Sequence, residues 1–247
     1  MHVMQGVDEF EDRLIERFEQ HPVLAHIGQL PEADFVELLL QRRFVSLAFT
    51  PSYDLAIDLL GDEEGLRIAR VILREEYPDG LGHTPSHRED MIHDMRLLGI
   101  SRETMAASRP TAATRRAIGD TLGLIADAGG HHDSDLRLLT LLRFWGEVLV
   151  SVEYGRLWPR MEPLLVRDGR NSSRFYHPHY VHDAKTHSLA TVSLLSGTHS
   201  DRLATRVAEL MAGEESADRF KELEEQALAL KVSFYDQFLP AVDRVSA

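Results

Sequence analysis

The chain of 247 residues is 43% hydrophobic, carries a formal net charge of -13 and contains no cysteine. That hydrophobic share is sufficient for a sizeable core, and no Gly/Ser-rich or Pro-rich linker divides the chain, so we expect one domain over residues 1–247. The negative charge excludes nucleic acid and anionic membranes as partners, because both would repel the protein. The expected substrate is therefore a small molecule.

The absence of cysteine rules out disulfides, thiolate metal ligands and thiol nucleophiles. Residues 1–30 lack the basic and apolar regions of a secretory signal, and no apolar stretch is long enough to span a membrane. We therefore expect a cytoplasmic protein.

Helical periodicity dominates the chain, and alternating β-branched runs bounded by turns are almost missing. The sequence therefore predicts an all-α fold. The expected helices cover residues 6–20, 32–60 with a break at Pro51, 63–77, 86–98, 111–127, 134–166, 177–195, 200–212 and 215–242. The apolar side of the last helix fits packing in the core or against a second copy of the chain in a homodimer.

Carboxylates and histidines stand close together where the helix 63–77 ends. Glu76 lies near this end, and His83 and His87 follow in and after a Pro/Gly-rich loop. A helix end and its loop can fold back on each other and bring a carboxylate and an imidazole together. A solvated carboxylate and a loop histidine are the alternative interpretation.

The helix 134–166 is apolar all round and is therefore expected to be buried. It contains Glu147 and Glu153, and a buried ionised carboxylate costs several kcal/mol unless it is paired or binds a metal. Pairing with Arg143 or Arg156 on the same helix is the alternative to metal binding.

Four histidines and one aspartate lie between Phe175 and Ser188. If this segment is helical from Pro178 onward, His179, Asp183 and His187 stand at positions i, i+4 and i+8 on one face. Nitrogen and oxygen donors without thiolate suit iron, manganese or zinc, and an open site of two histidines and one carboxylate is typical of Fe(II) that reacts with O2. A surface helix with chance histidines is the alternative.

Together these segments resemble the haem-oxygenase-like diiron oxidase and oxygenase superfamily, whose fold relatives include thiaminase II and pyrroloquinoline-quinone synthase. The resemblance runs from about Leu60 to His187 and consists of a Glu followed by a His, a Glu on a later buried helix, and a His-x3-Asp-x2-3-His ending. It implies a single-domain haem-oxygenase-like helical bundle. The spacing between the aspartate and the last histidine is three residues here, whereas members of the superfamily often have two.

The resemblance also implies a set of metal ligands, with Glu153 preferred slightly over Glu147 as the second glutamate. The implied ligands are Glu76, His87, Glu153, His179, Asp183 and His187, with His83, Glu147 and His182 as alternatives. The implied cofactors are two Fe(II) ions per chain, with O2 as co-substrate. The implied reaction is N-oxygenation, desaturation or C–C cleavage of a small, amino-acid-derived substrate, with room for an external electron donor.

Two further classes of function fit the same residues. One is a cofactor-free oxidase of the quinone-synthase type, in which the histidines act as acid and base. The other is a non-catalytic haem- or metal-binding helical protein, for which His21 or His26 is a candidate axial ligand. Thiaminase-like hydrolysis is disfavoured, because that chemistry resembles one that needs a thiol nucleophile.

Overall fold

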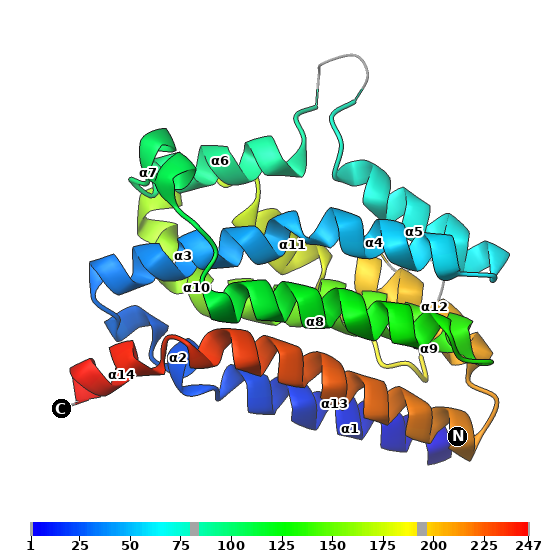
Figure 1. Ribbon diagram of the computed structural model, residues 1–247. Helices are drawn as coiled ribbons and strands as arrows, with labels where there is room; N and C mark the ends of the chain where they lie inside the picture. The colour runs from blue at the N-terminus through cyan, green and yellow to red at the C-terminus, as the bar shows by residue number, and fades with distance from the viewer. Residues whose placement is uncertain (1, 80–83, 192–196, 247) are drawn as a thin grey trace.

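The computed structural model describes residues 2–79, 84–191 and 197–246, and helices make up most of them, which confirms the all-α prediction (Figure 1). A short antiparallel hairpin of β1 and β2 follows α10. The elements are α1 (His2–Glu19), α2 (Pro22–Ala25), α3 (Glu32–Leu47), α4 (Phe49–Leu59), α5 (Glu63–Glu75), α6 (His87–Leu97), α7 (Arg102–Ala107), α8 (Ala112–Gly129), α9 (Ser134–Arg143), α10 (Leu149–Leu165), β1 (Val166–Arg167), β2 (Arg170–Asn171), α11 (Tyr176–His182), α12 (His199–Leu210), α13 (Glu214–Asp236) and α14 (Leu239–Ser246).

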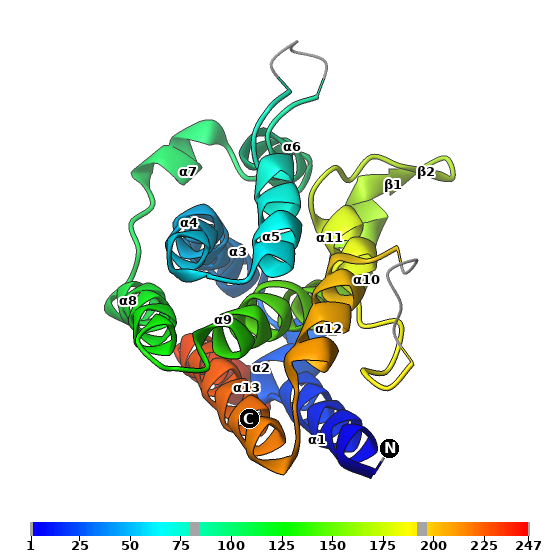
Figure 2. The same ribbon diagram turned by 90° about the vertical axis from the view of Figure 1, so that its right-hand side faces the viewer.

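A long helix runs through the middle of the bundle. It consists of α9, a π-helical turn over Phe144–Val148, and α10. Figure 2 shows α9 surrounded by neighbouring helices, and it contacts α4, α5, α8, α12 and α13. Residues 136–151 of this helix are buried, and Leu138, Leu142 and Leu149 have no exposed surface. Glu162 and Leu164 near its C-terminal end are exposed, so the prediction that the segment 134–166 is buried is confirmed only for residues 136–151. A chain section that is apolar all round can be stable only inside such a ring of helices.

The predicted helix 32–60 is divided three residues before the expected break. α3 ends at Leu47 and α4 begins at Phe49, so Pro51 lies in the first turn of α4. Proline is tolerated there, because the first backbone N–H groups of a helix have no partner within the helix. The predicted helix 215–242 is likewise divided, into α13 and α14.

The predicted helix 177–195 is much shorter in the structure. α11 ends at His182, and the chain then forms a loop toward α12. Residues 192–195 of the predicted helix lie outside the described residues. Side chains from other helices hold this loop: Asp201 of α12 accepts hydrogen bonds from the backbone of Thr186 and His187, and Asp8 of α1 accepts one from Leu189. These bonds satisfy backbone groups that a helix would have satisfied internally.

In the described part of the chain no helix is long and apolar enough to cross a membrane.

Candidate metal centre

Six side chains with metal-ligating atoms meet in the core of the bundle. They form two groups of three, and the ligating atoms within each group lie within 4.8 Å of one another. Both groups line one cavity. The first group is Glu76, His87 and His179, and the second is Glu147, Asp183 and His199.

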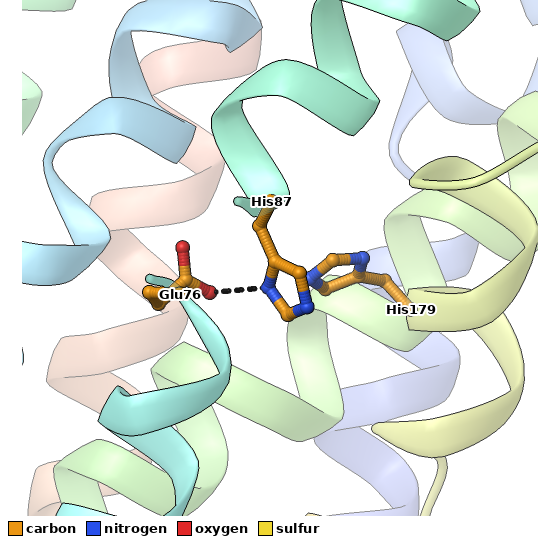
Figure 3. Close-up of side chains that lie close together, drawn as sticks. All are labelled: Glu76, His87 and His179. Carbon is orange, nitrogen blue, oxygen red and sulfur yellow. Dashed lines mark hydrogen bonds and ion pairs between the residues drawn. The ribbon is translucent and has the colours of Figure 1, made fainter. Parts of the chain in front are cut away.

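The first group joins three helices (Figure 3). Glu76 caps the C-terminal end of α5, His87 is the first residue of α6, and His179 lies in α11. Nδ1 of His87 lies 2.7 Å from Oε1 of Glu76, and the ring centroids of His87 and His179 are 4.7 Å apart. Nδ1 of His179 donates a hydrogen bond to the carbonyl oxygen of Phe175, so its Nε2 keeps a lone pair for a metal.

Local capping interactions place the two histidines of this group. Ser86 and Glu89 form a capping box that determines where α6 begins. Further along α6, the buried carboxylate of Asp94 accepts backbone hydrogen bonds from Phe175 and Tyr176 at the start of α11. The same carboxylate therefore holds α11 against α6, which brings their imidazoles together.

The second group is more deeply buried. Glu147 lies in the π-helical turn, Asp183 caps the C-terminal end of α11, and His199 begins α12. Nδ1 of His199 lies 3.4 Å from Oε2 of Glu147 and 3.6 Å from Oδ1 of Asp183. Two other side chains orient the group, because Tyr53 donates a hydrogen bond to Glu147, and Glu75 lies 3.2 Å from Nε2 of His199. A π-helical turn inside an α-helix is frequent at functional sites.

The two buried carboxylates of the second group require a positive charge beside them. Burial and the nearby Glu147 carboxylate raise the pKa of Asp183 well above its usual range. Burial alone would lower the pKa of His199, but its hydrogen bonds with Asp183 and Glu147 raise it to about 12, so this imidazole holds a proton. A metal ion would supply the same positive charge and displace the proton, as metal binding to histidine does in general.

The first group contains an imidazole in the form that binds metals. Burial, helped by the nearby His87, lowers the pKa of His179 to about 3, so it is neutral at physiological pH. Burial would also lower the pKa of His87, but its hydrogen bond with Glu76 outweighs this effect and raises it. Both groups therefore offer nitrogen and oxygen donors without thiolate, a donor set that fits iron.

Glu153, which the sequence favoured slightly over Glu147, lies outside both groups. Its carboxylate accepts a hydrogen bond from Nε of Arg42 at 2.6 Å and lies 3.0 Å from Nζ of Lys231. The two glutamates are six residues apart, about one and two-thirds turns of helix, so they point to different sides. Arginine pairing of Glu153 does occur, but the arginine comes from α3 and not from Arg156. The structure therefore places Glu147, and not Glu153, in a donor group.

His187 also lies outside both groups. Its Nδ1 is 2.6 Å from Oδ2 of Asp201, and its side chain is 49% exposed. The predicted placement of His179, Asp183 and His187 on one helix face required a helix that continues past residue 182, and α11 ends there. His179 and Asp183 therefore reach the candidate centre, one in each group, and His187 does not.

His182 and His83 were also candidate ligands on the sequence. His182 lines the cavity, with its ring centroid 6.3 Å from that of His199, but it belongs to neither group. His83 lies outside the described residues.

His199 completes the second group and was not predicted from the sequence. The signal in the sequence was its spacing, because the apolar Leu203 and Val207 follow His199 at i+4 and i+8. In the structure all three residues are buried. A histidine within the buried stripe of an amphipathic helix points into the core, where it needs a polar partner.

The fold is shared with solved structures of low sequence identity. A CADD-like protein of unknown function from Nostoc punctiforme has a TM-score of 0.65 at 12% identity, with 96% of this chain and 95% of that chain covered. A domain of unknown function with a heme oxygenase-like fold from Shewanella denitrificans has a TM-score of 0.64 at 17% identity, with 96% and 90% covered. A TenA homologue from P. horikoshii has a TM-score of 0.60 at 13% identity, with 97% and 99% covered.

No model of a known protein family matches the chain, and no curated protein gives a significant match. The structural likeness extends over nearly the whole chain in each comparison. The chain therefore has the haem-oxygenase-like fold, as the resemblance in its sequence predicted.

Proposed function

We propose that this protein is an O2-dependent oxidase or oxygenase that holds two iron ions and acts on a small substrate. The observation that supports this proposal most directly is the meeting of two three-donor groups at one cavity. One group supplies two imidazoles and one carboxylate, and the other supplies one imidazole and two carboxylates. Paired sites of histidines and carboxylates inside helical bundles are typical of di-iron proteins.

Three side chains of the centre have partners that orient them. The backbone carbonyl of Phe175 fixes the tautomer of His179, Tyr53 holds the carboxylate of Glu147, and Glu75 holds the ring of His199. Such outer contacts keep ligands in place and tune their basicity. Two bound iron ions would supply the activation of O2.

The substrate is proposed to be an amino-acid-derived small molecule, as the resemblance implies, and an external electron donor is part of the same proposal. The apolar side chains Phe49, Ile72 and Pro178 line the cavity together with the ligating groups. They would reduce the access of water to the centre and leave a surface for the apolar part of a substrate.

The test is the iron content after anaerobic loading with Fe(II). We expect close to two irons per chain. The variants His179→Ala and His199→Ala each remove one donor, so each should lose about one iron per chain or bind it at least about tenfold more weakly. Iron is measured after desalting, and circular dichroism confirms that each variant is folded.

His187→Ala is the matched control, because it removes a histidine of the same region that lies outside both groups. It should keep the iron content of the unchanged protein. Equal loss of iron in the His187 and His199 variants, or no specific uptake by the unchanged protein, contradicts the proposed centre.

A cofactor-free oxidase is a second candidate, and one observation favours it. Four imidazoles line the cavity, those of His87, His179, His182 and His199, and imidazole is the side chain that most often transfers protons in catalysis. Substrate-dependent O2 consumption that survives removal of metal by a chelator would support this candidate over the diiron centre.

A further inference from the structure

A second cavity lies beside the candidate metal centre. Glu76, His179 and Phe49 line both cavities, so the two spaces meet at the first donor group. The other residues of the second cavity are Arg42, Val45, Ser46, Trp145, Gly146, Val150, Tyr154, Phe175 and Lys231. Its walls are therefore largely apolar and aromatic, with two cationic side chains among them.

Arg42 and Lys231, which both line this cavity, share the carboxylate of Glu153 behind it. Glu153 accepts a hydrogen bond from Nε of Arg42 at 2.6 Å and lies 3.0 Å from Nζ of Lys231. The side chains of all three are at most 4% exposed. Arg42 also donates to the hydroxyl of Ser46, which is a neutral acceptor. Two buried cations therefore face one anion.

An unbalanced buried charge is costly, and proteins keep such groups where a ligand or a reaction uses them. Burial lowers the pKa of Lys231 to about 8, even though Glu153 acts in the opposite direction. Nζ of Lys231 lies 5.2 Å from the ring centroid of Trp145, so its surroundings on that side are aromatic. An incoming anion would balance the second positive charge.

We propose that Arg42 and Lys231 bind the carboxylate of a small substrate in this cavity, with its apolar body toward Glu76 and His179. The guanidinium group has five N–H donors, of which only part are used by Glu153 and Ser46, so it can also donate to a substrate carboxylate. The assignment of this ligand as the substrate rests on the proposed function, whereas the binding site itself does not.

The test is ligand binding followed by the fluorescence of Trp145, in the Trp158→Phe background, with metal-free protein. The probes are hexanoate and phenylacetate, each compared with its neutral amide. We expect each acid to bind at least about tenfold more tightly than its amide, because only the acid makes charge-assisted hydrogen bonds. Lys231→Met should remove about tenfold of the affinity for the acids and leave that for the amides unchanged.

Lys221→Met is the matched control, because this lysine lies on the same helix at the surface, 3.7 Å from Asp218. It should leave all affinities unchanged. Lys231→Arg keeps the positive charge and should keep the preference for acids, which tests the proposal independently if Lys231→Met does not fold. Equal binding of acids and amides by the unchanged protein, or an acid preference that Lys231→Met leaves intact, overturns the proposal.

Because these measurements need no iron, the two proposals can fail separately. Iron uptake without a preference for acids would leave the metal centre standing and reject the carboxylate site. A preference for acids that depends on Lys231, without iron uptake, would keep the carboxylate site and reject the proposed diiron function.

Discussion

Glu147 and Glu153 carry the same functional group on one continuous helix, and their surroundings give them different roles. Glu147 faces Asp183 and His199 in the second donor group, whereas Glu153 faces the cations Arg42 and Lys231. A carboxylate with two cationic partners is compensated within the protein. A carboxylate beside a second carboxylate needs a proton or a metal ion.

Glu153→Gln should lower the free energy of unfolding by about 3–5 kcal/mol, because it leaves two buried cations without their anion. Glu162→Gln, at an exposed position of the same helix, should change it by less than about 0.5 kcal/mol. Urea denaturation at neutral pH measures both. Folded Glu153→Gln protein should still bind two irons, whereas Glu147→Gln should not. Iron loss in the Glu153 variant would identify this residue as a ligand after all.

Asp62 connects two helices that carry parts of the centre. It caps the N-terminus of α5 by accepting a hydrogen bond from the backbone of Gly65, and it pairs with Arg206 of α12. α5 leads to Glu76, and α12 begins with His199. One side chain therefore fixes the start of one helix and its distance from the other.

Asp62→Ala should lower the free energy of unfolding by about 1–2 kcal/mol at pH 7, through loss of the cap and of the ion pair. The hydrogen bond with Arg206 lowers the pKa of Asp62 in the folded protein. The contribution is therefore fully present above the unfolded carboxyl value of about 4, and it is lost as the pH falls through the lower folded value.

Urea denaturation at pH 7 and at successively lower pH measures the difference between the unchanged protein and Asp62→Ala. The difference should shrink below pH of about 4. Glu63→Ala, which removes an exposed carboxylate from the same first turn, is the control and should cost less than half as much at pH 7. A difference that does not change with pH would assign the effect of Asp62 to something other than its charge.

At the scale of the whole molecule, the six donors come from α6, α11, α12, the π-helical turn and the two residues that cap the C-terminal ends of α5 and α11. Elements far apart in the chain therefore meet at one point. A buried ion network also connects distant elements. Arg143 of α9 pairs with Glu11 of α1, and Lys185 of the loop after α11 lies 2.8 Å from the same Glu11. A metal bound at the centre would bind the folded chain in preference to the unfolded one.

Metal binding should therefore stabilise the whole fold. At a free Fe(II) concentration of 100 times the Kd, the gain is about 2.7 kcal/mol, which raises the Tm by about 5–10 °C for a chain of this size. Anaerobic thermal unfolding with and without Fe(II) measures the shift. His199→Ala should reduce the shift, and His187→Ala should keep it. The same shift in both variants would mean that the metal binds elsewhere.

The helical architecture and several parts of the centre could be predicted from local patterns. The buried helix with Glu147 was predicted from its apolar pattern, and the pair Glu76 and His87 from a helix end and the loop that follows it. His179 and Asp183 were predicted from their spacing, because a helix places residues four apart on one face. The confirmed fold and the meeting of these pairs in one cavity agree with that local information.

The rest was decided by contacts between residues far apart in the chain. The sequence by itself could not distinguish Glu147 from Glu153, because their difference lies in partners supplied by α3 and α13. The sequence predicted that His187 lies on the same helix as His179, but α11 ends at His182. The backbone at His187 forms a loop whose N–H groups donate to Asp201 of α12. His199 joins the centre only because α12 packs against α9 and the π-helical turn. Local periodicity determines which face of a helix is buried, and tertiary packing determines which buried groups meet.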